Sequence, residues 1–311
     1  MHSIRKTDLL RHMRALATLL VMTALLVAPA AWAQKNFRTP DDAFKALVGA
    51  ARAHDSKALE SILGPGGKKI LPSGDPVADR NALDRFAKAY DEANKIETAG
   101  EEKATLTVGN DAWPFPIPVI KTAGGWHFDP KQGQEELLNR RIGRNELTVI
   151  QVVQAYVDAQ REYYTRNPEN DKLLHYAQKF VSTKGKRDGL YYPTPDGQPP
   201  SPLGVLFARG QAEGYKPGTA AKPNPYYGYY YRILKGQGPN AKGGAYDYVA
   251  KGKMIGGFAL VAYPAEYRKT GVMTFIVDHD GVVFQKDLGP KTAAIAGKMT
   301  KFDPDATWKR L

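Results

Sequence analysis

The densest group of chemically active side chains in the sequence is Asp278-His279-Asp280-Gly281. Carboxylates and an imidazole this close together are typical metal ligands, but an EF-hand calcium loop also needs a glutamate at its twelfth position, where this chain has Gly289. Short apolar runs flank the group, and an Asp-Gly pair is typical of a tight hairpin turn. The pattern therefore predicts a β-hairpin turn and not a site.

The remaining candidates for chemistry are dispersed. The histidines after residue 33 are His54, His127, His175 and His279, and none has the spacing of a zinc site. The serines lack the settings of activated nucleophiles, and the sequence has no phosphate-binding loop and no cysteine. The sequence accordingly predicts no catalytic residue, no metal ligand and no cofactor.

Tyrosine clusters give the candidate binding residues. If residues 226–231 form a strand, Tyr227, Tyr229 and Tyr231 share one face, while Tyr191 and Tyr192 fall in a loop. Exposed tyrosines make flat platforms for sugars or partner chains. The alternative is that the rings complete a sheet core, which is favoured because tyrosine is a common strand residue.

The first 33 residues predict a secretory signal peptide. Basic residues precede an uninterrupted run of apolar or small residues, 15–28, and Ala31-Trp32-Ala33 places small residues where a signal peptidase cleaves. The run is shorter than the roughly 18 residues of a membrane-spanning helix. We expect cleavage after Ala33, a periplasmic protein, and no stable membrane span after cleavage.

The net charge and the absence of cysteine limit the classes of partner that we expect. The chain of 311 residues carries a net charge of +12, its basic residues are spread along its length, and it has no cysteine. An exported chain of this kind holds together through its apolar core and not through disulfides. We expect no nucleic-acid partner, and an envelope protein or glycan as the unknown partner.

The hydrophobic pattern predicts an α+β protein with two domains. Residues 36–140 show helical periodicity and then strand alternation, which indicates helices plus a small curled antiparallel sheet, the order of an NTF2-like module. Within it, Trp113–Lys121 contains Pro114, Pro116 and Pro118. Since proline has no amide hydrogen, an edge strand is expected there.

Residues 141–311 predict a long helix followed by an antiparallel sheet, the order of the globular part of a pilin. Gly143 is a candidate break in the helix between the two domains. A segment rich in proline, glycine and tyrosine, 165–225, predicts a long irregular loop.

Several long strings resemble one family of exported bacterial proteins, catalogued as domain of unknown function 2950. They include "RRIGRNELTVIQVVQAYVDAQREY", "GKRDGLYYP", "GGAYDYV" and "GKMIGGFALVAYPAEY". The resemblance covers nearly the whole chain after the leader. It implies an envelope location, and it implies no activity and no functional residue. The second half is also weakly similar in order to type IV pilins and pseudopilins.

Three functions are consistent with the sequence. The first is a non-enzymatic binding or assembly module of the envelope. The second is a hydrolase acting on an envelope polymer, with a carboxylate pair drawn from distant segments. The third is a pilin-like structural subunit. The carboxylates considered for the hydrolase are Asp158, Glu162, Asp188 and Glu266.

Overall fold

The computed structural model describes residues 34–216 and 223–311, so the expected signal peptide lies outside the described residues. The chain is α+β, with helices and antiparallel sheets, as the sequence predicts. Within the described ranges, no helix combines the length and apolar character needed to cross a membrane.

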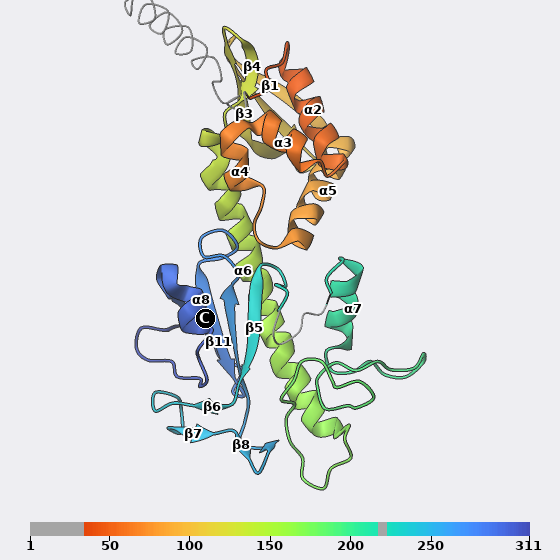
Figure 1. Cartoon of the computed structure of the whole chain (residues 1–311), viewed down its shortest axis with the longest axis vertical. Helices are drawn as coiled ribbons and strands as arrows, with labels where there is room; N and C mark the ends of the chain where they lie inside the picture. The colour runs from red at the N-terminus through yellow and green to blue at the C-terminus, as the bar shows by residue number, and fades with distance from the viewer. Residues whose placement is uncertain (1–33, 217–222) are drawn as a thin grey trace, which may run out of the picture.

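The N-terminal part packs helices on one four-stranded antiparallel sheet of order β1-β2-β3-β4 (Figure 1). Thr39, Asp55 and Asp75 cap three of its helices by accepting hydrogen bonds from the first turn. Phe44, Leu106 and Phe128 are among its fully buried side chains. The elements are α2 (Pro40–Arg52), α3 (Ser56–Leu63), η1 (Gly64–Gly66), α4 (Gly67–Ile70), α5 (Pro76–Glu92), β1 (Asn94–Ala99), β2 (Lys103–Val108), β3 (Trp113–Thr122) and β4 (Gly125–Phe128).

The proline-rich strand β3 is not an edge strand, and this prediction is wrong. It pairs with β2 on one side and with β4 on the other. Strand β4 is short, however, and pairs only with residues 119–122, beyond the last proline. The physical argument thus holds locally, because the proline-bearing part has a strand partner on one side only.

Helix α6 (Pro130–Arg166) continues from the first sheet into the second half of the molecule (Figure 1). It is 37 residues long and passes through Gly143 without a break, so the predicted interruption is wrong. It contacts β3 of the first sheet and, in the second sheet, β10 (Ala259–Pro264) and β11 (Met273–Asp278). A helical glycine costs stability but does not by itself break a helix that is packed at both ends.

The C-terminal part is built on a five-stranded antiparallel sheet of order β13-β12-β11-β10-β5. Its β11–β12 hairpin confirms the turn predicted at Asp280-Gly281, with Gly281 at a φ of +82°. The described residues of the segment 165–225 are largely irregular and include helix α7. The elements are α7 (Gly204–Ala212), β5 (Tyr229–Leu234), β6 (Gly236–Gln237), β7 (Tyr246–Asp247), β8 (Val249–Ala250), β9 (Lys253–Met254), β10 (Ala259–Pro264), β11 (Met273–Asp278), β12 (Val283–Asp287), η2 (Gly289–Lys291), α8 (Thr292–Ala296) and β13 (Lys309–Arg310).

Strand β5 begins later than the tyrosine pattern predicts. Tyr227 and Gly228 have φ angles of +49° and +75° and form the turn of a small hairpin, in which Tyr226 and Tyr229 exchange backbone hydrogen bonds. Tyr227 therefore does not share a strand face with Tyr229 and Tyr231, which corrects the prediction. The cause is the following glycine, which favours a turn with positive φ at both central residues.

Buried polar contacts join the two parts beside α6. One Asp75 carboxylate oxygen accepts hydrogen bonds from the Gly228 amide at 2.8 Å and the Tyr215 hydroxyl at 3.1 Å. The Asn145 side chain, on α6, donates to the Thr270 carbonyl at 2.9 Å. Because Asp75 and Asn145 are 1% and 5% exposed, breaking these bonds would leave buried polar groups without partners.

Two glycines of α6 give a matched test of this packing. A methyl group at Gly133 would meet Pro116 O at 2.4 Å and Ile117 N at 2.8 Å, whereas one at Gly143 would meet nothing within 4 Å. Gly133→Ala should therefore lower the free energy of unfolding by about 1–3 kcal/mol through overpacking against β3. Gly143→Ala should raise it by about 0.5–1 kcal/mol through helix propensity.

Urea unfolding of the two variants and the parent protein measures both changes. Equal effects at the two positions would contradict the close approach of α6 to β3.

Candidate functional site

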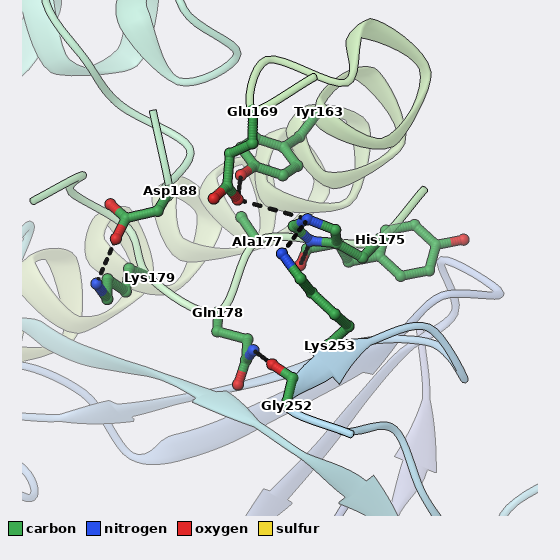
Figure 2. A pocket seen from close by; sticks show the side chains of 10 residues that line it. Tyr163, Glu169, His175, Ala177, Gln178, Lys179, Asp188, Gly252 and Lys253 are labelled. Carbon is green, nitrogen blue, oxygen red and sulfur yellow. Dashed lines mark hydrogen bonds and ion pairs between the residues drawn. The ribbon is translucent and has the colours of Figure 1, made fainter. Parts of the chain in front are cut away.

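A small polar pocket lies at the C-terminal end of α6, between the loop that follows the helix and the β8–β9 hairpin (Figure 2). Its volume is about 190 Å³, below the roughly 300–1,000 Å³ of sites for drug-sized ligands. Charged and amide side chains and two tyrosines dominate its wall. The lining residues are Tyr163, Glu169, His175, Tyr176, Ala177, Gln178, Lys179, Asp188, Gly252 and Lys253.

The C-terminal end of α6 fixes the backbone of the loop that directly follows it, which we call the pocket loop. Asn167 caps the helix in the left-handed conformation, with a φ of +44°, which asparagine tolerates better than most residues. Its side chain accepts a hydrogen bond from the Asp171 amide at 3.0 Å and donates to the Asp171 carbonyl at 2.8 Å. The turn between them is therefore closed on itself, which fixes where Glu169 and Asp171 leave the backbone.

Two further attachments hold the loop in place. On the helix side, the fully buried amide of Gln160 donates to the Ala177 carbonyl at 2.8 Å and accepts from the Ala177 amide at 2.9 Å. On the sheet side, the Tyr176 amide donates to Met254 O at 2.8 Å, and Gln178 donates to Gly252 O at 2.8 Å. The pocket is thus built from the end of α6 with the loop that directly follows it, and from the β8–β9 hairpin, which is distant in sequence.

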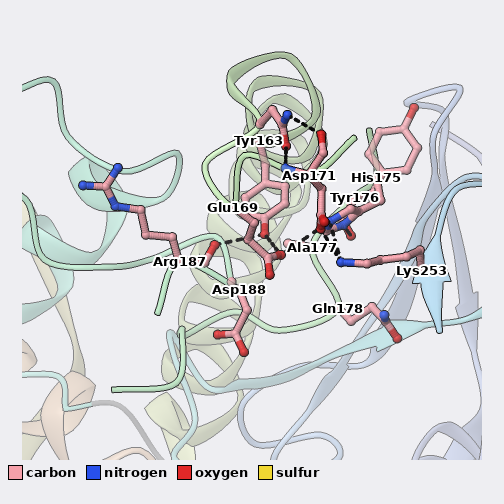
Figure 3. A network of polar contacts seen from close by, with 12 residues as sticks. Tyr163, Glu169, Asp171, His175, Tyr176, Ala177, Gln178, Arg187, Asp188 and Lys253 are labelled. Atoms are coloured by element: carbon pink, nitrogen blue, oxygen red, sulfur yellow. Dashed lines mark hydrogen bonds and ion pairs between the residues drawn. The ribbon is translucent and has the colours of Figure 1, made fainter. Parts of the chain in front are cut away.

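An ionic cluster forms one wall (Figure 3). His175 Nε2 lies 3.0 Å from an Asp171 carboxylate oxygen, 3.5 Å from Glu169 Oε1 and 3.3 Å from Lys253 Nζ. Lys253 also forms an ion pair with Asp171. The His175 side chain is only 6% exposed, and the Tyr163 hydroxyl donates to Glu169 at 2.7 Å. The imidazole is therefore buried against two carboxylates and one ammonium group.

The environment keeps two carboxylates ionised at neutral pH, Asp188 in the pocket and Asp171 beside it. Hydrogen bonds from Lys253 and then His175 hold the pKa of Asp171 below its ordinary value of 3.8. Burial raises the pKa of Asp188, but hydrogen bonds from Lys179 and from the Thr183 amide and hydroxyl outweigh it and lower that pKa to about 2. Asp171 and Asp188 therefore stay ionised near pH 7 and do not exchange protons there.

The tyrosines proposed for binding do not form a platform that is open to solvent. Tyr229 is fully buried and donates to Met273 O at 3.0 Å, and Tyr192 is 6% exposed. Tyr191, Tyr227 and Tyr231 are half-buried. Tyr191 stacks on Phe207 with ring centroids 4.2 Å apart. The Tyr229 hydroxyl lies against Glu146 of α6 and Met273 of β11, and Tyr191 packs on Phe207 of α7, so these rings are at least partly covered.

The carboxylates considered for a hydrolase each pair with a different cation. Asp158 lies 3.9 Å from Arg161, Glu162 pairs with Arg166, and Glu266 pairs with Lys269 at 2.5 Å. Asp188 pairs with Lys179 at 2.7 Å and is the only one of the four that lines the pocket.

Sequence reasoning missed the cluster of Glu169, Asp171 and His175. Each residue offers one ligand atom, and these three atoms all lie within 4.8 Å of one another. The spacing Glu-x-Asp-x₃-His, directly after the asparagine cap of a long helix, is the one signal in the sequence. It is weak because it falls in a segment with no periodicity, where the sequence does not determine which side chains meet.

Gln160 tests how the pocket loop is held. Gln160→Leu keeps the approximate shape of the side chain but leaves the amide and carbonyl of Ala177 unsatisfied. We expect the free energy of unfolding to fall by roughly 2–5 kcal/mol, since each buried polar group without a partner costs about 1–3 kcal/mol.

The control is Gln154→Leu, on the same helix, where an exposed amide makes one bond to Gly281 O. That change should stay within about 0.5 kcal/mol. Denaturant unfolding measures the free energy of unfolding of both variants. A decrease no larger for Gln160→Leu than for Gln154→Leu would refute the role of Gln160.

Comparison with known proteins adds a family and no activity. The model of the family described as "Protein of unknown function (DUF2950)" matches residues 34–311. No curated protein and no solved structure matches the chain. The match covers all of the described residues, as the resemblance in the sequence implies. The chain therefore belongs to the DUF2950 family of proteins of unknown function.

Proposed function

We propose that this protein is an exported, non-enzymatic binding module of the cell envelope that holds one sugar unit of an envelope glycan in the pocket at the end of α6. The observation that carries the proposal is the pocket itself. Its charged groups are already paired, and its loop is fixed by buried hydrogen bonds. Such a preorganised site binds a ligand without first having to order its own side chains.

The electrostatics favour binding over hydrolysis. A glycosidase needs one carboxylic acid whose pKa is raised enough to donate a proton. Asp171 and Asp188 have lowered pKa values instead. Among the described residues, burial raises the pKa of Asp79 and Asp278, but neither of them lines the pocket.

Size and chemistry favour a sugar as the occupant. A volume of about 190 Å³ suits a single small ring. The wall offers amide, ammonium and carboxylate groups to hydroxyls, and Tyr163 and Tyr176 also line it. A few polar groups beside aromatic side chains are a common lining for a site that holds a small ring.

The leader supports an envelope location. Its basic front, apolar run and small residues at positions 31 and 33 are those of an exported protein. The family match begins at residue 34, directly after the expected cleavage position.

Titration calorimetry of residues 34–311 against a panel of envelope glycans tests the proposal. The panel contains solubilised peptidoglycan strands and lipopolysaccharide core sugars. We expect at least one glycan to bind, and we expect Gln178→Ala to weaken that binding about five- to tenfold, since the variant removes a polar group worth about 1 kcal/mol from the pocket wall.

Gln151→Ala, at an exposed position of α6 outside the pocket, is the matched control and should bind as the parent does. Absence of binding across the panel, or equal binding by the parent and Gln178→Ala, would contradict the proposal.

A further inference from the structure

In the ionic cluster, Glu169, Asp171 and His175 bring one ligand atom each close together, an arrangement that can hold a cation. His175 Nδ1 lies 3.2 Å from the Tyr176 carbonyl, which can only accept a hydrogen bond, so Nδ1 carries a hydrogen. In the neutral imidazole, Nε2 then presents its lone pair. In that form the lone pair faces Asp171 and Glu169, whose oxygens lie 3.0 and 3.5 Å from Nε2, whereas in the imidazolium form Nε2 donates to Asp171 instead. The neutral form therefore brings three electron-pair donors to one point, where a cation can bind.

Lys253 supplies that cation within the protein. Its ammonium group lies 3.3 Å from His175 Nε2 and pairs with Asp171. One ammonium group leaves the two carboxylates with a net charge of −1. A divalent ion in its place would neutralise both carboxylates and accept the imidazole lone pair at the same time.

We propose that Glu169, Asp171 and His175 form a binding site for a divalent transition-metal ion, which displaces Lys253 when it binds. One imidazole nitrogen with two carboxylate oxygens is a donor set suited to Zn²⁺ or Mn²⁺. Calcium and magnesium prefer sites made of oxygen ligands alone. Glu169 is exposed and Asp171 is half-buried, so both can rotate to close the 4.8 Å spread of the ligand atoms around one ion.

The groups around the ligands fit a metal site. The Tyr163 hydroxyl orients Glu169, the Tyr176 carbonyl fixes the His175 tautomer, and Asn167 holds the backbone of Asp171. Such outer contacts set the direction and basicity of metal ligands. The inference deepens the proposed function, because the ion would form part of the wall of the same pocket, but its test uses no glycan.

The test is calorimetric titration of the tag-free protein, residues 34–311, with ZnCl₂, MnCl₂ and CaCl₂ separately. We expect one Zn²⁺ or Mn²⁺ per chain and much weaker binding of Ca²⁺. Asp171→Asn and Glu169→Gln keep the shape of each side chain and should each weaken binding at least tenfold. Zinc should also shift the Nε2 resonance of His175 in nitrogen-15 spectra.

Lys253 gives a test that a purely structural cluster would fail. Lys253→Met removes the competing ammonium group and should tighten metal binding about tenfold. Lys179→Met removes another paired lysine of the same pocket and should change it less than threefold. Asp84→Asn controls for the other described histidine–aspartate pair, His54 with Asp84, and should have no effect.

The proposal is overturned if neither the parent nor Lys253→Met binds a metal ion, or if Asp171→Asn and Glu169→Gln bind as the parent does. Binding by Lys253→Met alone would also overturn it, since the lysine would then hold the site permanently in the native protein. Metal binding without glycan binding would leave this inference standing and refute the proposed function. Glycan binding without metal binding would refute this inference and leave the proposed function standing.

Discussion

Helix α6 contributes to both hydrophobic clusters of the molecule. Near its start, Leu137 packs against the N-terminal cluster, and from Val149 to Tyr163 most of its buried side chains belong to the C-terminal one. Between them, Asn145 and Glu146 bind backbone groups of the segment 270–273. Because one continuous helix serves both cores, the position of each sheet is fixed relative to the same axis, and the rest of the fold depends on that helix remaining unbroken.

The pocket depends on the same helix at its far end. Gln160, near the end of α6, and Asn167, the C-cap of α6, each satisfy both the amide and the carbonyl of one loop residue. A loop without secondary structure usually satisfies its polar backbone with water. Here the side chains of a helix do so, which explains how an irregular segment can hold charged groups in fixed positions.

The sequence predicts well the features that depend on residues close together in the chain. The Asp280-Gly281 hairpin, the α+β class and the long amphipathic helix follow from turn residues and periodicity. Prediction from the sequence fails where a residue or strand depends on partners outside its own periodic segment. The pairing of β3 depends on how short β4 is, and Tyr227 enters a turn because of Gly228. The site is missed because Glu169, Asp171 and His175 fall in a segment without periodicity, and because Lys253 meets Asp171 from 82 residues away.

The central claim is that the pocket is assembled in advance and held as firmly as the helix that carries it. Native-state hydrogen exchange of residues 34–311 tests this most directly, by comparing the Ala177 amide, bound to Gln160, with the Val157 amide inside α6. The account predicts protection of Ala177 within about tenfold of Val157, a difference of about 1.4 kcal/mol. Exchange of Ala177 at the rate of the exposed turn residue Gly185 would contradict it.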